Sequence, residues 1–183
     1  MLFRSHPNSA VIYNLICSQA VPETIRESGG KPIRSRVGHS FIKELMANHD
    51  AIFGGEHSGH FYFSDFWRAD SGMLAALHAI AALGESQLTL SELLAPYARY
   101  FASGEINSKV SDSKAIMAAI KSQYGAKSGV TTDELDGLTI DGDTWWFNVR
   151  ASNTEPLLRL NVEAKTQAQM AALRDEVLAV IRG

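Results

Sequence analysis

AIFGGEHSGH occupies residues 51–60 of the chain. Its first three residues form a short apolar run, which is typical of a buried strand. Two glycines follow directly, and they release the backbone for close approach to a ligand. A carboxylate, a hydroxyl and two imidazoles then fall within positions 56–60. Because loops at the carboxyl ends of strands bind ligands in open α/β folds, this stretch predicts a binding loop on an α/β sheet.

Strands alternate with helices upstream of this loop. The apolar, β-branched run Val11–Cys17 predicts a buried strand, and the helix that follows ends at Gly29-Gly30. A second strand is expected over residues 32–37, and a second helix begins at His39 or Ser40. This alternation predicts a sheet with parallel neighbours, because each crossover between parallel strands needs a helix-sized connection.

The chain is expected to change domain near residue 100. Before it, Asp70-Ser71-Gly72 caps an alanine-rich helix, and Pro96 bends or ends a second helix that starts at Ser91-Glu92. After it, the pattern predicts strand 105–110, helix 112–123, a hairpin over 137–150, strand 157–164 and helix 167–182. The predicted domains are therefore residues 1–100 and residues 101–183.

The predicted fold class is α/β. The first domain is expected to be a mixed α/β domain that is incomplete, because a strand begins within about a dozen residues of Met1 and nothing precedes it to cover one sheet edge. The second is expected to be a small α+β domain, an antiparallel sheet with helices on one face. Its last helix presents an apolar stripe that includes Leu173 and Val177.

Composition excludes several classes of function. The 183 residues carry a formal net charge of −3, whereas a general nucleic-acid binder or a binder of anionic membranes needs a basic surface. No apolar stretch has the length of a transmembrane helix, and the first residues lack a secretory signal pattern. Cys17 is the only cysteine, so no intramolecular disulfide can form. We expect a cytoplasmic protein with neither nucleic-acid nor membrane partners.

The polar loop at residues 56–60 admits three interpretations. Glu56 can accept hydrogen bonds from two vicinal sugar hydroxyls, and Ser58 can donate or accept one. The loop can instead be a polar turn that only links two strands. His57 and His60 have His-x-x-His spacing beside an acid, so a metal site is the third interpretation, although a zinc enzyme needs three ligands in fixed geometry.

A second polar loop covers Arg150-Ala151-Ser152-Asn153-Thr154-Glu155-Pro156, between two strand-like runs. An arginine followed by two hydroxyls and a carboxamide is the donor set that a phosphate dianion requires. The alternative is a hairpin connection in which Asn153 and Thr154 bond their own backbone.

Two further polar features lie outside these loops. His39 stands at the start of a helix, so it can contact substrate or move a proton. It can equally be a polar residue at a helix start. Asp141-Gly142-Asp143 has carboxylates that suit magnesium, but its place between two strands predicts a hairpin turn.

Three motifs together resemble the phosphohexomutases, the family of phosphomannomutase, phosphoglucomutase and phosphoglucosamine mutase. Residues 55–60 resemble the sugar-specificity loop in the third domain of that family, and residues 150–156 resemble the phosphate-binding loop of its fourth domain. Residues 36–43 are similar to a stretch whose histidine lies in the active site. The three motifs occur in the family's order and approximate spacing, and the resemblance covers nearly the whole chain.

The resemblance implies a two-step phosphoryl transfer. A phosphoserine in the first domain donates to the sugar phosphate, and the hexose 1,6-bisphosphate reorients before it returns a phosphoryl group. In this chain Glu56, Ser58 and His60 would bind the sugar, and His39 would lie near the transferred group as a catalytic residue. The implied phosphate ligands are Arg150, Ser152, Asn153 and Thr154. Mg²⁺ would be held by the second domain, so no metal site is expected in this chain.

Two parts of the family pattern are absent from the sequence. It contains neither a Ser-His-Asn-Pro-like nucleophile loop nor an Asp-Gly-Asp-Gly-Asp-like metal loop. The resemblance therefore implies the carboxyl-terminal half of a mutase, inactive alone, whose partners are mannose or glucose 1- and 6-phosphates and the missing amino-terminal half. The residues also fit two other functions: a non-catalytic module that binds sugar phosphates, and a metal-dependent enzyme that uses His57 and His60.

Overall fold

The structure is a computed structural model that describes residues 6–152 and 155–183. The chain forms two compact units, Met1–Arg99 and Tyr100–Gly183, and each contains one five-stranded sheet. Among the described residues, no helix is long and apolar enough to cross a membrane.

The first unit is a mixed α/β sheet in the strand order β2-β1-β3-β4-β5. The strands of this sheet and the helices that connect them are, in chain order, β1 (Ala10–Asn14), α2 (Ala20–Glu27), β2 (Lys31–Ser35), α3 (His39–Asn48), β3 (Phe53–Gly55), β4 (Phe61–Phe63), η1 (Ser64–Phe66) and β5 (Ala69–Asp70). β1 runs parallel to β2 and β3, and β4 and β5 are antiparallel to their neighbours. The predicted mixed α/β fold is confirmed for this unit.

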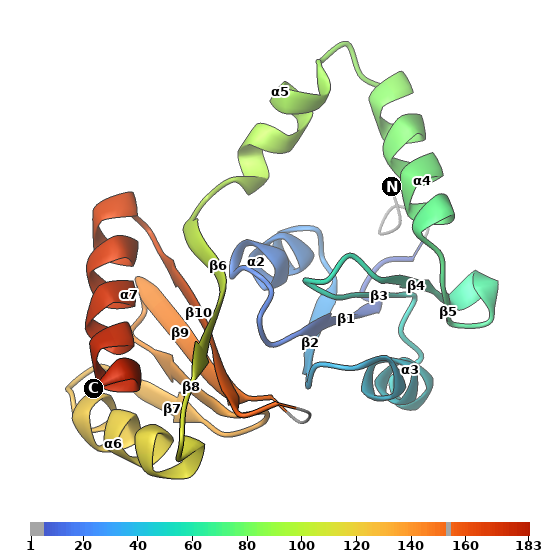
Figure 1. Cartoon of the computed structure of the whole chain (residues 1–183). Coiled ribbons are helices and arrows are strands. Elements are labelled where there is room, and N and C mark those ends of the chain that lie inside the picture. The colour runs from blue at the N-terminus through green and yellow to red at the C-terminus, as the bar shows by residue number, and fades with distance from the viewer. Residues whose placement is uncertain (1–5, 153–154) are drawn as a thin grey trace. The chain divides into compact units, whose positions relative to one another are not determined.

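The two crossovers of this sheet run in opposite directions from β1. The connection through α2 leads to β2 on one side of β1, and the connection through α3 leads to β3 on the other. Because such crossovers are right-handed, α2 and α3 lie on opposite faces of the sheet (Figure 1). The carboxyl ends of β1 and β3 therefore form a topological switch point, where open α/β sheets bind ligands.

β3 contains the two glycines that the sequence pattern placed after the strand. The strand begins at Phe53 rather than Ala51, and Gly54 pairs with Ile12 of β1. A Cβ on Gly54 would lie only 2.8 Å from Cγ2 of Ile42 in α3. Glycine is therefore required here by the close approach of α3, and this packing is invisible in the sequence. The β4–β5 pair was also not predicted.

The first unit continues into two further helices and a single turn, α4 (Gly72–Gly84), α5 (Leu90–Leu94) and η2 (Ala95–Tyr97). Ser71 caps α4 by accepting a hydrogen bond from the Leu74 amide, as the sequence predicts. α5 has a capping box between Thr89 and Glu92, so it begins one residue before the predicted start at Ser91.

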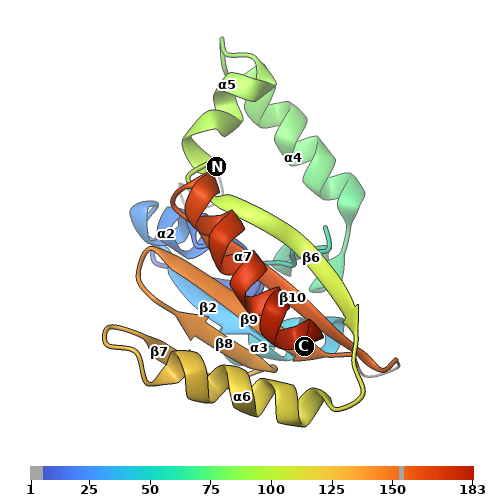
Figure 2. The ribbon, with the colours of Figure 1, turned by 60° about the vertical axis from the view of Figure 1, so that its left-hand side comes forward.

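The second unit is an antiparallel sheet in the order β6-β10-β9-β8-β7. Its elements are β6 (Phe101–Lys109), α6 (Ser113–Gly125), β7 (Thr131–Asp133), β8 (Leu138–Asp141), β9 (Trp145–Ala151), β10 (Leu157–Ala164) and α7 (Gln167–Arg182). α6 and α7 pack on one face of this sheet (Figure 2), so the predicted α+β arrangement is confirmed. The turn at Gly142 and Asp143 joins β8 to β9 as a hairpin, as expected.

Candidate functional site

Glu56 is the first residue after β3, and it lies at the switch point of the first sheet. Its side chain is only 3% exposed. Oε2 accepts hydrogen bonds from the Gly38 amide (3.2 Å) and from Nδ2 of Asn14 (3.5 Å), the last residue of β1. Oε1 accepts one from the Tyr62 hydroxyl (2.7 Å). A carboxylate has about four acceptor positions, so one is left for a ligand.

Tyr62 connects Glu56 to His39. Burial, followed by the adjacent Glu56 carboxylate, raises the pKa of the Tyr62 hydroxyl, so this group keeps its proton. The single proton points to the Glu56 carboxylate, and the Tyr62 oxygen also lies 2.5 Å from Nδ1 of His39. His39 Nδ1 must therefore be the donor in this second bond, which leaves Nε2 as its other polar atom. His39 itself is exposed at the first turn of α3.

His60 is held in the same way by Asp70 of β5. Nδ1 of His60 lies 2.5 Å from Oδ2 of Asp70, and Oδ1 of Asp70 accepts a 2.9 Å hydrogen bond from the Phe61 amide. These two bonds, that with His60 first, hold the pKa of Asp70 below its ordinary value. The rings of His39 and His60 meet edge to face with centroids 4.4 Å apart.

The loop between β3 and β4 closes on itself. The Glu56 amide donates to the His60 carbonyl (2.9 Å), and the Gly59 amide donates to the Glu56 carbonyl (3.0 Å). Gly59 has φ +84°, which favours glycine. His57 and Ser58 are exposed at the tip. The loop thus presents Ser58 to solvent beside two fixed imidazoles.

The predicted phosphate loop joins β9 to β10 in the second unit. Arg150 is only 13% exposed, and its guanidinium lies 3.6 Å from Glu105 and 4.0 Å from Asp136. Both distances exceed that of a hydrogen bond, and Nε of Arg150 is buried with no partner among the described residues. The Ser152 amide bonds the Leu157 carbonyl (2.9 Å). The other two predicted phosphate ligands, Asn153 and Thr154, lie outside the described residues.

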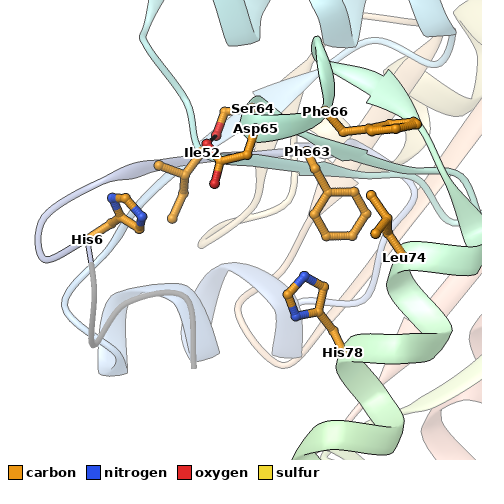
Figure 3. Close-up of a pocket in the computed structure, with 8 residues that line it drawn as sticks. All are labelled: His6, Ile52, Phe63, Ser64, Asp65, Phe66, Leu74 and His78. Atoms are coloured by element: carbon orange, nitrogen blue, oxygen red, sulfur yellow. Dashed lines mark hydrogen bonds between the residues drawn. The ribbon is translucent and has the colours of Figure 1, made fainter.

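A separate pocket of roughly 270 Å³ lies between β4 and α4 (Figure 3). It is mainly apolar, and Phe63 stacks on His78 with ring centroids 5.3 Å apart. The lining residues are His6, Ile52, Phe63, Ser64, Asp65, Phe66, Leu74 and His78. None of the predicted site residues lines this pocket.

The geometry does not bring together the pair His57 and His60 on which the metal interpretation rests. Among the described residues, the three side chains whose ligand atoms approach within 4.8 Å of one another are His39, His60 and Asp70. His57 does not belong to this group. Sequence reasoning also missed Asn14, Tyr62 and Asp70, because each reaches the site through pairing between strands, and no local motif marks them.

Comparisons with known proteins identify the family of both units. A family model described as phosphoglucomutase/phosphomannomutase, alpha/beta/alpha domain III, matches residues 1–100. A second, described as phosphoglucomutase/phosphomannomutase, C-terminal domain, matches residues 105–180. A phosphomannomutase of Methanocaldococcus jannaschii is 43% identical over 180 residues, which cover 98% of this chain and 39% of that relative. The chain thus spans less than half the length of the curated relatives it matches.

Solved structures share the fold. A phosphoglucomutase/phosphomannomutase family protein of Burkholderia thailandensis has a TM-score of 0.83 at 24% identity and covers 99% of this chain and 39% of that chain. Aspergillus fumigatus N-acetylphosphoglucosamine mutase has TM-scores of 0.69 and 0.71 at 14% and 13% identity, over 97% and 96% of this chain and 39% and 42% of those chains. Those two structures contain glucose 1,6-bisphosphate, and GlcNAc-6P with magnesium, respectively.

Proposed function

The chain belongs to the phosphoglucomutase/phosphomannomutase family, and we propose that it supplies the sugar-binding and phosphate-binding parts of a phosphohexomutase. The complete enzyme would interconvert hexose 6-phosphate and hexose 1-phosphate by phosphoryl transfer. Relatives that match nearly this whole chain are named phosphomannomutase, which supports this substrate class.

The observation that carries the proposal is the chain of contacts from Glu56 through Tyr62 to His39 at the switch point. Glu56 keeps one acceptor position for a sugar hydroxyl, and Ser58 and His60 offer further groups from the same loop. His39 donates from Nδ1 to Tyr62, so its unprotonated Nε2 would lie near the transferred group, where it could accept the proton of the reacting sugar hydroxyl. Phosphoryl transfer depends on such positioning and on charge stabilisation.

Arg150 would bind the phosphate that does not react. The carboxylates of Glu105 and Asp136 lie near its guanidinium, at 3.6 and 4.0 Å, but neither is close enough to accept a hydrogen bond. The N–H donors of Arg150 therefore remain available to an anion. Ser152, Asn153 and Thr154 would complete the set. A hexose 1,6-bisphosphate, bound by one solved structure of this fold, would be the intermediate that turns around between the two half-reactions.

Magnesium does not fit the residues described in this chain. Mg²⁺ prefers six oxygen ligands in octahedral geometry, whereas the close group here offers two imidazole nitrogens and one carboxylate. We therefore place the magnesium of the complete enzyme outside this chain, and we expect the chain alone to be inactive as a mutase.

A chimera tests the proposal. This chain would replace the region of the M. jannaschii phosphomannomutase that aligns with it, and a coupled assay would follow conversion of mannose 1-phosphate to mannose 6-phosphate. We expect turnover by the chimera. Glu56→Gln in the chimera should lower kcat/KM about 10- to 100-fold, the effect of losing a hydrogen bond to a charged group.

Glu44→Gln is the matched control, because Glu44 is exposed on α3. A folded chimera that binds hexose phosphates without turnover would favour the non-catalytic module. A folded chimera that neither binds nor turns over would end the proposal.

A further inference from the structure

The imidazole rings of His39 and His60 lie against each other at the switch point. A single histidine is enough for proton transfer, so this pairing needs another explanation. His39 and His60 come from different elements, yet their ring centroids lie 4.4 Å apart at an interplanar angle of 68°. Each ring has its Nδ1 against an oxygen at 2.5 Å: the Tyr62 hydroxyl for His39 and the Asp70 carboxylate for His60.

These oxygens fix both tautomers. A carboxylate only accepts, so His60 donates from Nδ1 to Asp70, and the single proton of the Tyr62 hydroxyl is already donated in its hydrogen bond to Glu56. Both neutral rings therefore have their lone pair on Nε2. Within the described part of the chain, neither Nε2 has a hydrogen-bond partner.

We propose that His39 and His60 bind a divalent transition-metal ion, Zn²⁺ in the first instance, through their Nε2 atoms. Histidine ligands of metals nearly always donate their other N–H to a carboxylate or a similar acceptor, which fixes the ring and raises its basicity. Asp70 does this for His60, and Tyr62, backed by Glu56, does it for His39.

The distances suit one ion. One ligand atom from each of His39, His60 and Asp70 lies within 4.8 Å of the other two, and the two imidazole centroids are 4.4 Å apart. Two nitrogen ligands of one zinc ion, with Zn–N bonds of about 2.0–2.1 Å, lie roughly 3.3 Å apart. Small movements of the two partly exposed rings would bring both Nε2 atoms to one ion. Imidazole nitrogens favour zinc, copper and nickel over magnesium. The ion would keep open positions for water or a phosphate oxygen, and it would occupy the rings on which hexose phosphate is proposed to bind.

Metal titration of the full 183-residue chain, free of any tag, tests the site. Zn²⁺ binding is measured against a chromophoric chelator, and Co²⁺ serves as an optical probe of nitrogen coordination. We expect one ion per chain, and His39→Ala and His60→Ala should each weaken binding at least about tenfold. Asp70→Asn and Tyr62→Phe should each weaken it about tenfold, because they release a ring without removing a ligand.

His57→Ala and His78→Ala are the matched controls. His57 is exposed in the same loop, and His78 belongs to the neighbouring pocket, so both variants should bind like the unmodified chain. Two outcomes would overturn the proposal: equal weakening of Zn²⁺ binding by His57→Ala, or unchanged binding in His39→Ala and His60→Ala. Either result would mean that exposed imidazoles bind Zn²⁺ nonspecifically. Circular dichroism confirms that each variant is folded.

A measurement on the metal-free chain gives an independent check. Long-range proton–nitrogen NMR spectra distinguish the two neutral tautomers of histidine, and we expect Nδ1–H in both His39 and His60. An Nε2–H tautomer in either ring would contradict the arrangement. Neither experiment contains a sugar, so failure of the metal site and failure of the proposed mutase function are distinguishable.

Discussion

The hydroxyl of Tyr62 donates a 2.7 Å hydrogen bond to Oε1 of Glu56. Both side chains are buried, and the two residues stand on either side of the loop that the sequence singles out. This bond stabilises the carboxylate in a place from which water is largely excluded.

Tyr62→Phe should destabilise the first unit by about 1–3 kcal/mol, because the buried Glu56 carboxylate loses its closest donor. Urea unfolding followed by amide NMR signals of β1 and α3 measures the effect. Tyr13→Phe is the control, since the Tyr13 hydroxyl of β1 has no hydrogen bond among the described residues. Equal losses in the two variants would show that the Tyr62–Glu56 bond adds nothing to stability.

Gly54→Ala should destabilise the first unit by about 1–3 kcal/mol through overpacking. The new Cβ would lie 2.8 Å from Ile42 Cγ2 and 3.1 Å from the sulfur of Met46. At Gly55 the nearest atom, on Phe53, is 3.4 Å away, so Gly55→Ala should change stability by only about 0.5 kcal/mol. Denaturant titration measures the free energy of unfolding of both variants. A Gly54→Ala protein as stable as Gly55→Ala would contradict the close packing of Gly54 against α3.

Much of the fold follows from local pattern. Strand 157–164 and helix 167–182 have the predicted bounds, because most of the strand and the apolar stripe through Leu173 and Val177 are buried in one core. β4 and β5 were missed. β4 is only three residues long, all of them aromatic, and β5 has two residues. The pairing of such short strands depends on contacts made elsewhere in the sheet.

The candidate site was only half predictable. Glu56 and His60 stand out because glycines isolate polar residues after a strand. Tyr62 lies hidden in an aromatic run, and Asp70 was read as part of a helix cap, whereas it bonds His60 ten residues away. Such partners are defined by strand register, which brings Tyr62 opposite Asp70, and a single sequence does not reveal that register.

Alkaline pH should weaken the second unit through Tyr124. Burial, followed by the charge of Glu176 and the hydrogen bond to it, raises the pKa of the Tyr124 hydroxyl to about 12. The unfolded value is about 10, so this stabilisation is complete below pH ~10 and is lost as the pH rises through ~12. We measure the free energy of unfolding by urea titration, followed by amide signals of α6. Between pH ~10 and ~12 this free energy should fall less in Tyr124→Phe than in the unmodified chain. Identical declines would contradict the raised pKa.

Arg150→Lys should weaken binding of inorganic phosphate about tenfold, because lysine cannot offer the planar pair of donors. The Ser152 amide shift during a phosphate titration reports the affinity. Arg174→Lys is the control, since Arg174 lies in α7 and pairs with its neighbour Asp175. Equal affinities in Arg150→Lys and the unmodified chain would remove Arg150 from the phosphate site.

The most direct test of the central claim is an amide-resolved NMR titration of the full chain with mannose 1-phosphate, repeated with Glu56→Gln. We expect saturable shifts at Gly55–His60 and around Arg150, and we expect the first set to be lost or strongly weakened in the variant. A well-folded chain whose Gly55–His60 amides do not move, or a variant that titrates like the unmodified chain, would contradict recognition of hexose phosphate by this loop.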